Sequence, residues 1–60
     1  MEYVLLRYRE RPDHVVDIAA TSQPDEAISF VRRWSHRPQD EGLIVAIRDR
    51  PVVHCAPRAR

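Results

Sequence analysis

The chain has 60 residues, enough for a single domain. Apolar residues make up 43% of it and the formal net charge is +1, a balance typical of globular rather than disordered chains. No apolar run approaches the roughly 18 residues of a membrane span, and the first residues lack the pattern of a signal peptide. The single cysteine, Cys55, cannot form an internal disulfide. We therefore expect one cytoplasmic domain over residues 1–56, followed by a short basic tail, 57–60.

The first third of the chain predicts a β-hairpin. Residues 3–9 alternate aromatic, aliphatic and basic side chains, and residues 14–20 are rich in β-branched residues. Between them, Pro12 fixes its own φ and Asp13 can bond to its local backbone, which favours a turn. The short connection predicts that the two strands pair antiparallel.

The middle of the chain predicts a helix over about residues 23–36. Ser22 and Asp25 have capping-box spacing, acids occupy the first turn, and arginines occupy the last turns before Pro38. The apolar face of this helix consists of Ala27, Phe30, Val31 and Trp34. We expect Trp34 to anchor the core, because it continues this helical stripe.

The last third predicts two more strands. Residues 43–48 are apolar on both faces, which is typical of an interior strand, and residues 51–56 form a shorter strand whose Pro51 favours an edge or a first position. The connection around Asp49 and Arg50 is either a two-residue or a four-residue loop, because this pair is not a favoured two-residue hairpin sequence.

The order strand, strand, helix, strand, strand predicts a single α+β domain with one helix across one face of a four-stranded, mainly antiparallel sheet. Two strand orders fit: 2-1-3-4, and 2-1-4-3, which resembles the β-grasp fold in outline. The apolar third strand favours the first. Under the helix we expect Val4, Leu6, Tyr8, Val16, Ile18, Val45 and Ile47.

Alternation then assigns the other sheet face an apolar patch rimmed by arginines, which indicates a binding surface. Its expected residues are Tyr3, Leu5, Arg7, Arg9, Val15, Asp17, Ile44, Ala46 and Arg48. A second copy could cover this face, with Arg7 or Arg48 pairing with Asp17 at the rim, and a larger protein could use the same face or an edge strand. The leading hypothesis is a protein-binding module of a regulatory or inhibitory kind that forms a homodimer.

Nucleic-acid binding is the alternative. Tyr3 on the sheet face could stack on bases, while the candidate phosphate contacts are Arg7, Arg9, Arg32, Arg33 and Arg37. Convergence of these arginines on one side of the molecule would favour this alternative. The nine acidic residues and the few aromatic residues weigh against it.

Catalysis and cofactor binding have little support. The three histidines and Cys55 lack metal-binding spacing, and His54 and Cys55 are strand neighbours that point to opposite faces. One glycine cannot build a phosphate-binding loop, and a chain this small is expected to have little volume for a pocket. We therefore expect no enzyme activity, no metal and no cofactor, and we expect Cys55 to behave as a small buried apolar residue.

Overall fold

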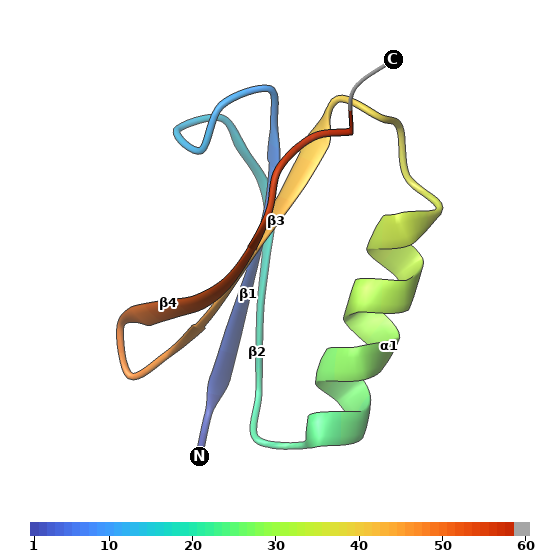
Figure 1. The fold of residues 1–60 in the computed structure, drawn as a ribbon. Helices are drawn as coiled ribbons and strands as arrows, with labels where there is room; N and C mark the ends of the chain where they lie inside the picture. The colour runs from blue at the N-terminus through green and yellow to red at the C-terminus, as the bar shows by residue number, and fades with distance from the viewer. Residues whose placement is uncertain (59–60) are drawn as a thin grey trace.

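The structure, a computed structural model, describes residues 1–58. In chain order the elements are β1 (Tyr3–Arg9), β2 (Val15–Thr21), α1 (Pro24–Ser35), β3 (Glu41–Ile47) and β4 (Arg50–Cys55). The strands form one antiparallel sheet in the order β2-β1-β3-β4, with α1 against one face (Figure 1). The predicted α+β class and the order 2-1-3-4 are thus confirmed, and the β-grasp order is wrong.

The ends of α1 are held by groups outside the helix. Gln23 is the N-cap residue and makes no side-chain cap; its backbone N–H donates to Thr21 Oγ1 at 3.0 Å, so the predicted Ser22 capping box does not form. At the other end, the guanidinium of Arg58 donates to the backbone oxygens of Ser35 (3.1 Å) and Arg37 (2.7 Å). A cation at this position also complements the helix dipole. Arg58, assigned to the basic tail by its sequence position, thus contacts the end of the helix, while residues 59–60 lie outside the described part.

A two-residue turn joins β3 to β4. Ile47 pairs with Arg50, and the two residues between them, Arg48 and Asp49, both have positive φ values of 52° and 64°. Positive φ at both central positions matches the twist of an antiparallel hairpin. Of the two expected loop lengths the shorter one is therefore present, but one residue earlier than expected, at Arg48-Asp49 rather than Asp49-Arg50.

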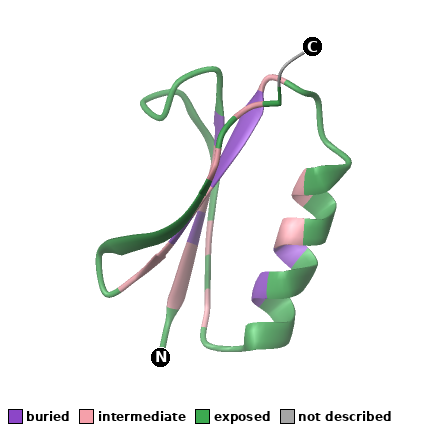
Figure 2. Ribbon diagram, viewed as in Figure 1, coloured by how far each residue is buried: buried purple, intermediate pink, exposed green. Residues whose placement is uncertain are grey.

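The helix covers only part of the sheet. It contacts β1, β2 and β3, and over residues 1–58 it makes no contact with β4. Leu5, Ala27, Phe30, Leu43 and Val45 form the buried core between helix and sheet, with Trp34 packed against it. Figure 2 shows that burial concentrates on the central strands and one side of α1, whereas β4 is almost entirely exposed.

The faces of β1, and of β2 beyond its bulge (residues 17–21), are the reverse of those expected from alternation. Leu5 lies in the core under the helix and is 1% exposed, while Leu6 points to the opposite face. Alternation could not decide between the faces, because both strands carry apolar residues at odd and even positions. Alternation placed Arg7 on the outer face with Leu5, yet Arg7 lines a cavity with Phe30 under the helix.

A buried carboxylate explains how arginine is accommodated on the helix side. Glu41 is 3% exposed, and its carboxylate lies 3.2 Å from Arg7 Nε and 3.6 Å from Arg9 Nη2. Its backbone oxygen accepts the indole N–H of Trp34 at 3.3 Å. A buried charge needs such pairing because desolvation alone would be costly. We infer that pairing with Glu41 helps to hold the odd-numbered residues of β1, which include Arg7 and Arg9, toward the helix.

Candidate functional site

The sheet face away from the helix, here called the open face, is a continuous apolar surface. At its centre Leu6 pairs with Ile18 on β2 and with Ile44 on β3, and Val4 pairs with Ala20 and Ala46 in the same way. The strand residues that the pairing places on this face are Val4, Leu6, Tyr8, Val15, Ile18, Ala20, Gly42, Ile44, Ala46, Pro51 and His54. A β-bulge in β2 sets Val15 and Val16 together opposite Tyr8.

The open face is only partly shielded from solvent. Ile18 is 59% exposed and Val15 and Val16 are about 40% exposed, whereas the central Leu6 and Ile44 are half-buried by their neighbours. No Asp, Glu or Arg occurs among its strand residues. A solvated antiparallel sheet normally alternates to polar residues on its outer face. This face instead resembles half of a protein core, which indicates an interaction surface.

One polar pair lies at the end of the open face. The Tyr8 Oη and His54 Nε2 are 2.6 Å apart, and the two rings are tilted by 52°. The Tyr8 ring crosses the intervening strand at Gly42, where a Cβ would clash with the ring. The only glycine in the chain therefore makes room for a tyrosine that is 2% exposed. A glycine paired with an aromatic residue is the sequence signal that could have revealed this contact.

The predicted interface residues divide between the two faces. Val15, Ile44 and Ala46 lie on the open face as expected. Tyr3, Leu5, Arg7, Arg9 and Asp17 lie on the helix side, and Arg48 lies in the β3–β4 turn. The expected rim of arginines is therefore wrong for β1, because those arginines belong to the Glu41 cluster. Val4, Leu6 and Ile18 were expected under the helix but lie on the open face, where their chain neighbours had been expected.

The candidate nucleic-acid contacts converge only in part. Arg7, Arg33 and Arg37 line one cavity of about 50 Å³ beside Asp17 and Trp34. Arg9 instead lies 3.7 Å from Asp40 and contacts Glu41. Arg32 is exposed and lines none of the described cavities. With Tyr3 on the helix side, the expected stacking platform on the open face is absent from the described residues.

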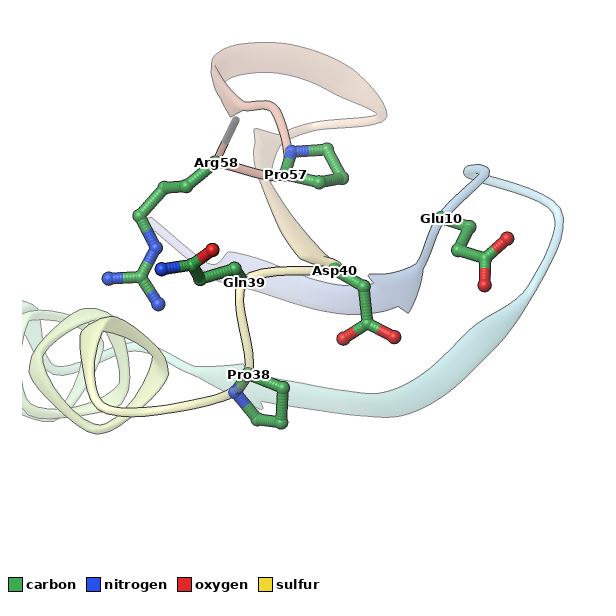
Figure 3. Close-up of a pocket in the computed structure, with 6 residues that line it drawn as sticks. All are labelled: Glu10, Pro38, Gln39, Asp40, Pro57 and Arg58. Carbon is green, nitrogen blue, oxygen red and sulfur yellow. The ribbon is translucent and has the colours of Figure 1, made fainter. Parts of the chain in front are cut away.

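Another cavity lies away from both faces, at one end of the sheet. It measures about 580 Å³ and is lined by Glu10, Pro38, Gln39, Asp40, Pro57 and Arg58. This hollow is open to solvent rather than enclosed. Figure 3 shows its charged groups on different parts of the chain: Glu10 follows β1, Asp40 precedes β3, and Arg58 lies in the C-terminal segment. Its lining contains no serine, cysteine or histidine.

Metal and membrane sites are not seen in the described part of the chain. No three His, Cys, Asp or Glu side chains among residues 1–58 lie close enough to hold a metal ion. Within the same residues, no helix has the length and apolarity needed to cross a bilayer. Cys55 packs against the core from β4, while His54 faces the other way, as their adjacent positions predict.

No protein-family model, curated protein or solved structure matches the chain. The structure itself defines a small α+β domain with one sheet face covered by the helix and one open face.

Proposed function

We propose that this protein is a small, non-enzymatic, protein-binding module of a regulatory or inhibitory kind that acts through its open face and self-associates there. The observation that supports the proposal is the uninterrupted apolar surface around Leu6, Ile18 and Ile44, which carries no charge. Charged residues are depleted in the cores of protein interfaces and obligate dimer interfaces are especially apolar. With its single cysteine, the protein suits a reducing compartment such as the cytoplasm.

The accessible surface of the chain and the area of the open face bear on what a second copy could bury. Its accessible surface is 4487 Å², compared with about 4,100 Å² expected from size scaling for a compact monomer of this mass. Three strands of seven residues and one of six, side by side, give the open face a footprint of about 450 Å². Two such footprints amount to about 900 Å². Because side chains protrude from the sheet, the accessible area buried is larger than this flat projection and approaches the roughly 1,200 Å² at which specific interfaces begin.

A second copy fits this face because an uncharged apolar surface is complementary to itself. Two sheets can pack face to face about 10 Å apart, with their strands at about 30° to one another. In a dimer with twofold symmetry, both copies contribute the same surface patch to the interface. The absence of charge on the open face means that no like charges meet in this arrangement.

The dimer can be tested by light scattering on a sizing column across a dilution series. We expect a mass near twice 7.1 kDa at high concentration, falling on dilution, and a monomer for Leu6→Gln at all concentrations. Ile28→Gln is the matched control, because Ile28 is a half-exposed apolar residue on α1. A monomeric wild-type protein would contradict self-association, and equal effects of the two variants would contradict the open face as its site.

Nucleic-acid binding is a second candidate, favoured by the cavity that Arg7, Arg33 and Arg37 share. Binding of this kind depends on phosphate contacts and weakens steeply as salt rises. Fluorescence anisotropy with single- and double-stranded oligonucleotides at two salt concentrations tests it. Salt-sensitive binding that Arg33→Gln weakens would support the candidate, and no binding at low salt would remove it.

A further inference from the structure

We propose that the free edge of β2, together with the cleft between β2 and α1, binds an extended peptide segment of a partner protein, with the pattern basic-x-apolar-x-acidic. This site lies on the helix side of the sheet, so it is separate from the open face and does not depend on dimer formation. The peptide would add as an antiparallel fifth strand beside β2. Its alternate side chains would enter the cleft.

The edge of β2 is available for strand addition. β2 is an outer strand whose only neighbour is β1, and beyond its bulge at Val15 and Val16 the five residues 17–21 pair without interruption. It contains no proline or lysine, the residues that often protect sheet edges from pairing. The other outer strand, β4, begins with Arg50 and Pro51 and carries a bulge. Of the two edges, β2 therefore offers the longer uninterrupted template.

The helix leaves room for side chains next to this edge. A cavity of about 330 Å³ lies between β2 and α1, and the smaller cavity of about 50 Å³ shares Phe30 and Arg33 with it. The floor of the larger cavity is apolar and includes Leu5, Ala19 and Phe30. Because Ala19 is small, a strand paired with β2 could place an aliphatic side chain opposite it, against this floor.

Charge varies along the cleft in a defined direction. α1 runs back along β2, so the residues of its first turn, Asp25 and Glu26, line the larger cavity together with Thr21. Arg33 lines both cavities, and Arg37, one turn further along, lines the smaller one beside Asp17. The cleft is therefore acidic near Thr21, apolar at Ala19 and basic near Asp17.

The basic end has unused capacity for a carboxylate. Over residues 1–58, neither Arg33 nor Arg37 forms an ion pair, whereas the nearby Arg7 is paired with Glu41. Arg33 lies over the Phe30 ring, 5.7 Å from its centroid, and its guanidinium fork can still bind a carboxylate. Two free cations outnumber the single carboxylate of Asp17, so this end favours an acidic side chain.

These positions define the order of residues in the peptide. An antiparallel strand runs from the Thr21 end of β2 toward the Asp17 end, with every second side chain on the helix side. Its basic residue then meets Asp25 and Glu26, its apolar residue meets the floor at Ala19, and its acidic residue meets Arg33 and Arg37. A second copy of β2 fits less well. A twofold pairing centred on Ala19 places Asp17 of each copy toward Asp25 and Glu26 of the other.

The test is a titration of the isotope-labelled protein, followed by NMR, with the synthetic peptide Thr-Arg-Val-Val-Thr-Glu-Thr, capped at both ends. We expect the largest shifts at the β2 amides and at Arg33, with little change at Leu6 and Ile44. Binding to the monomeric Leu6→Gln variant should be unchanged, so this site and the dimer can fail separately. Shifts on the open face, or no shifts at millimolar peptide, would overturn the proposal.

Charge reversal tests the basic end. We expect Arg33→Glu/Arg37→Glu to weaken binding by about tenfold, since two favourable ion pairs become repulsive. A peptide with arginine in place of its glutamate should bind this variant more tightly than it binds the wild type. Arg32→Glu is the matched control, because it makes the same change of charge on the helix outside the cleft. Equal losses from Arg32→Glu, or oligonucleotides that bind the same residues and exclude the peptide, would overturn the assignment.

Discussion

The two faces of the sheet are built from similar aliphatic residues, yet only one is buried. The helix side combines a core centred on Leu5 with an ion-paired cluster around Glu41. The open face has a more uniform apolar surface and one polar pair, Tyr8 with His54. The difference shows that the buried face of a two-sided apolar sheet is not set by apolar content alone. Here the fit of the helix and the pairing of buried charge select it.

The largest expected effect comes from the adjacent residues Leu5 and Leu6. Leu5→Ala removes a side chain that is 1% exposed and should lower the free energy of unfolding by about 2–5 kcal/mol, a large share of the stability of so small a domain. Leu6→Ala should cost about 1 kcal/mol in the dilute monomer, because its side chain is only half-buried. Urea unfolding at low protein concentration measures both.

This pair of variants also tests the assignment of the faces. If Leu6→Ala were the more destabilising change in the dilute monomer, the assignment of β1 would be reversed. In the proposed dimer, folding and association are coupled, so at high concentration the Leu6 variant should lose additional stability relative to the wild type.

The second prediction concerns the charged cluster of the helix side. Glu41→Ala leaves Arg7 without its carboxylate in a largely buried position, where its side chain is 15% exposed. Loss of one partner of a buried pair should cost about 3 kcal/mol. Asp40→Ala is the control, since its pair with Arg9 is about half exposed and should be worth less than about 1 kcal/mol. Similar thermal unfolding of the two variants would show that Glu41 does not orient β1.

A smaller effect is expected at the polar pair of the open face. Gly42→Ala places a methyl group against the Tyr8 ring and should cost about 1–3 kcal/mol, in the range of other overpacking changes. The displaced ring should also release His54, which the imidazole signals in an NMR spectrum would report. In a Tyr8→Leu background the same substitution should cost much less. An equal cost in both backgrounds would mean that Tyr8 is not the reason for the glycine.

The order and class of the elements could be predicted from sequence because their signals are local. Proline and acidic residues mark the start of α1, its arginines mark the end, and β-branched runs mark the strands. The apolar character of residues 43–48 correctly favoured a central β3 over an edge position. These features depend on chain neighbours, so no knowledge of long-range contacts was needed.

The faces of β1 and β2 could not be predicted in the same way. In β1, Val4 and Leu6 alternate with Tyr3 and Leu5, so either set could meet the helix. The deciding contact joins Arg7 to Glu41, which are 34 positions apart in a segment that looks like a polar connection. The candidate site was therefore placed on the correct side of β3 and on the wrong side of β1.

The most direct test of the account is a filtered NOE experiment on a mixture of differently labelled chains at high concentration. The face-to-face dimer predicts contacts between chains among the methyl groups of Leu6, Ile18 and Ile44, and none from Leu5 or Leu43. Contacts between chains confined to the edges or to α1, or no contacts between chains at all, would contradict the proposal that the open face binds a second copy.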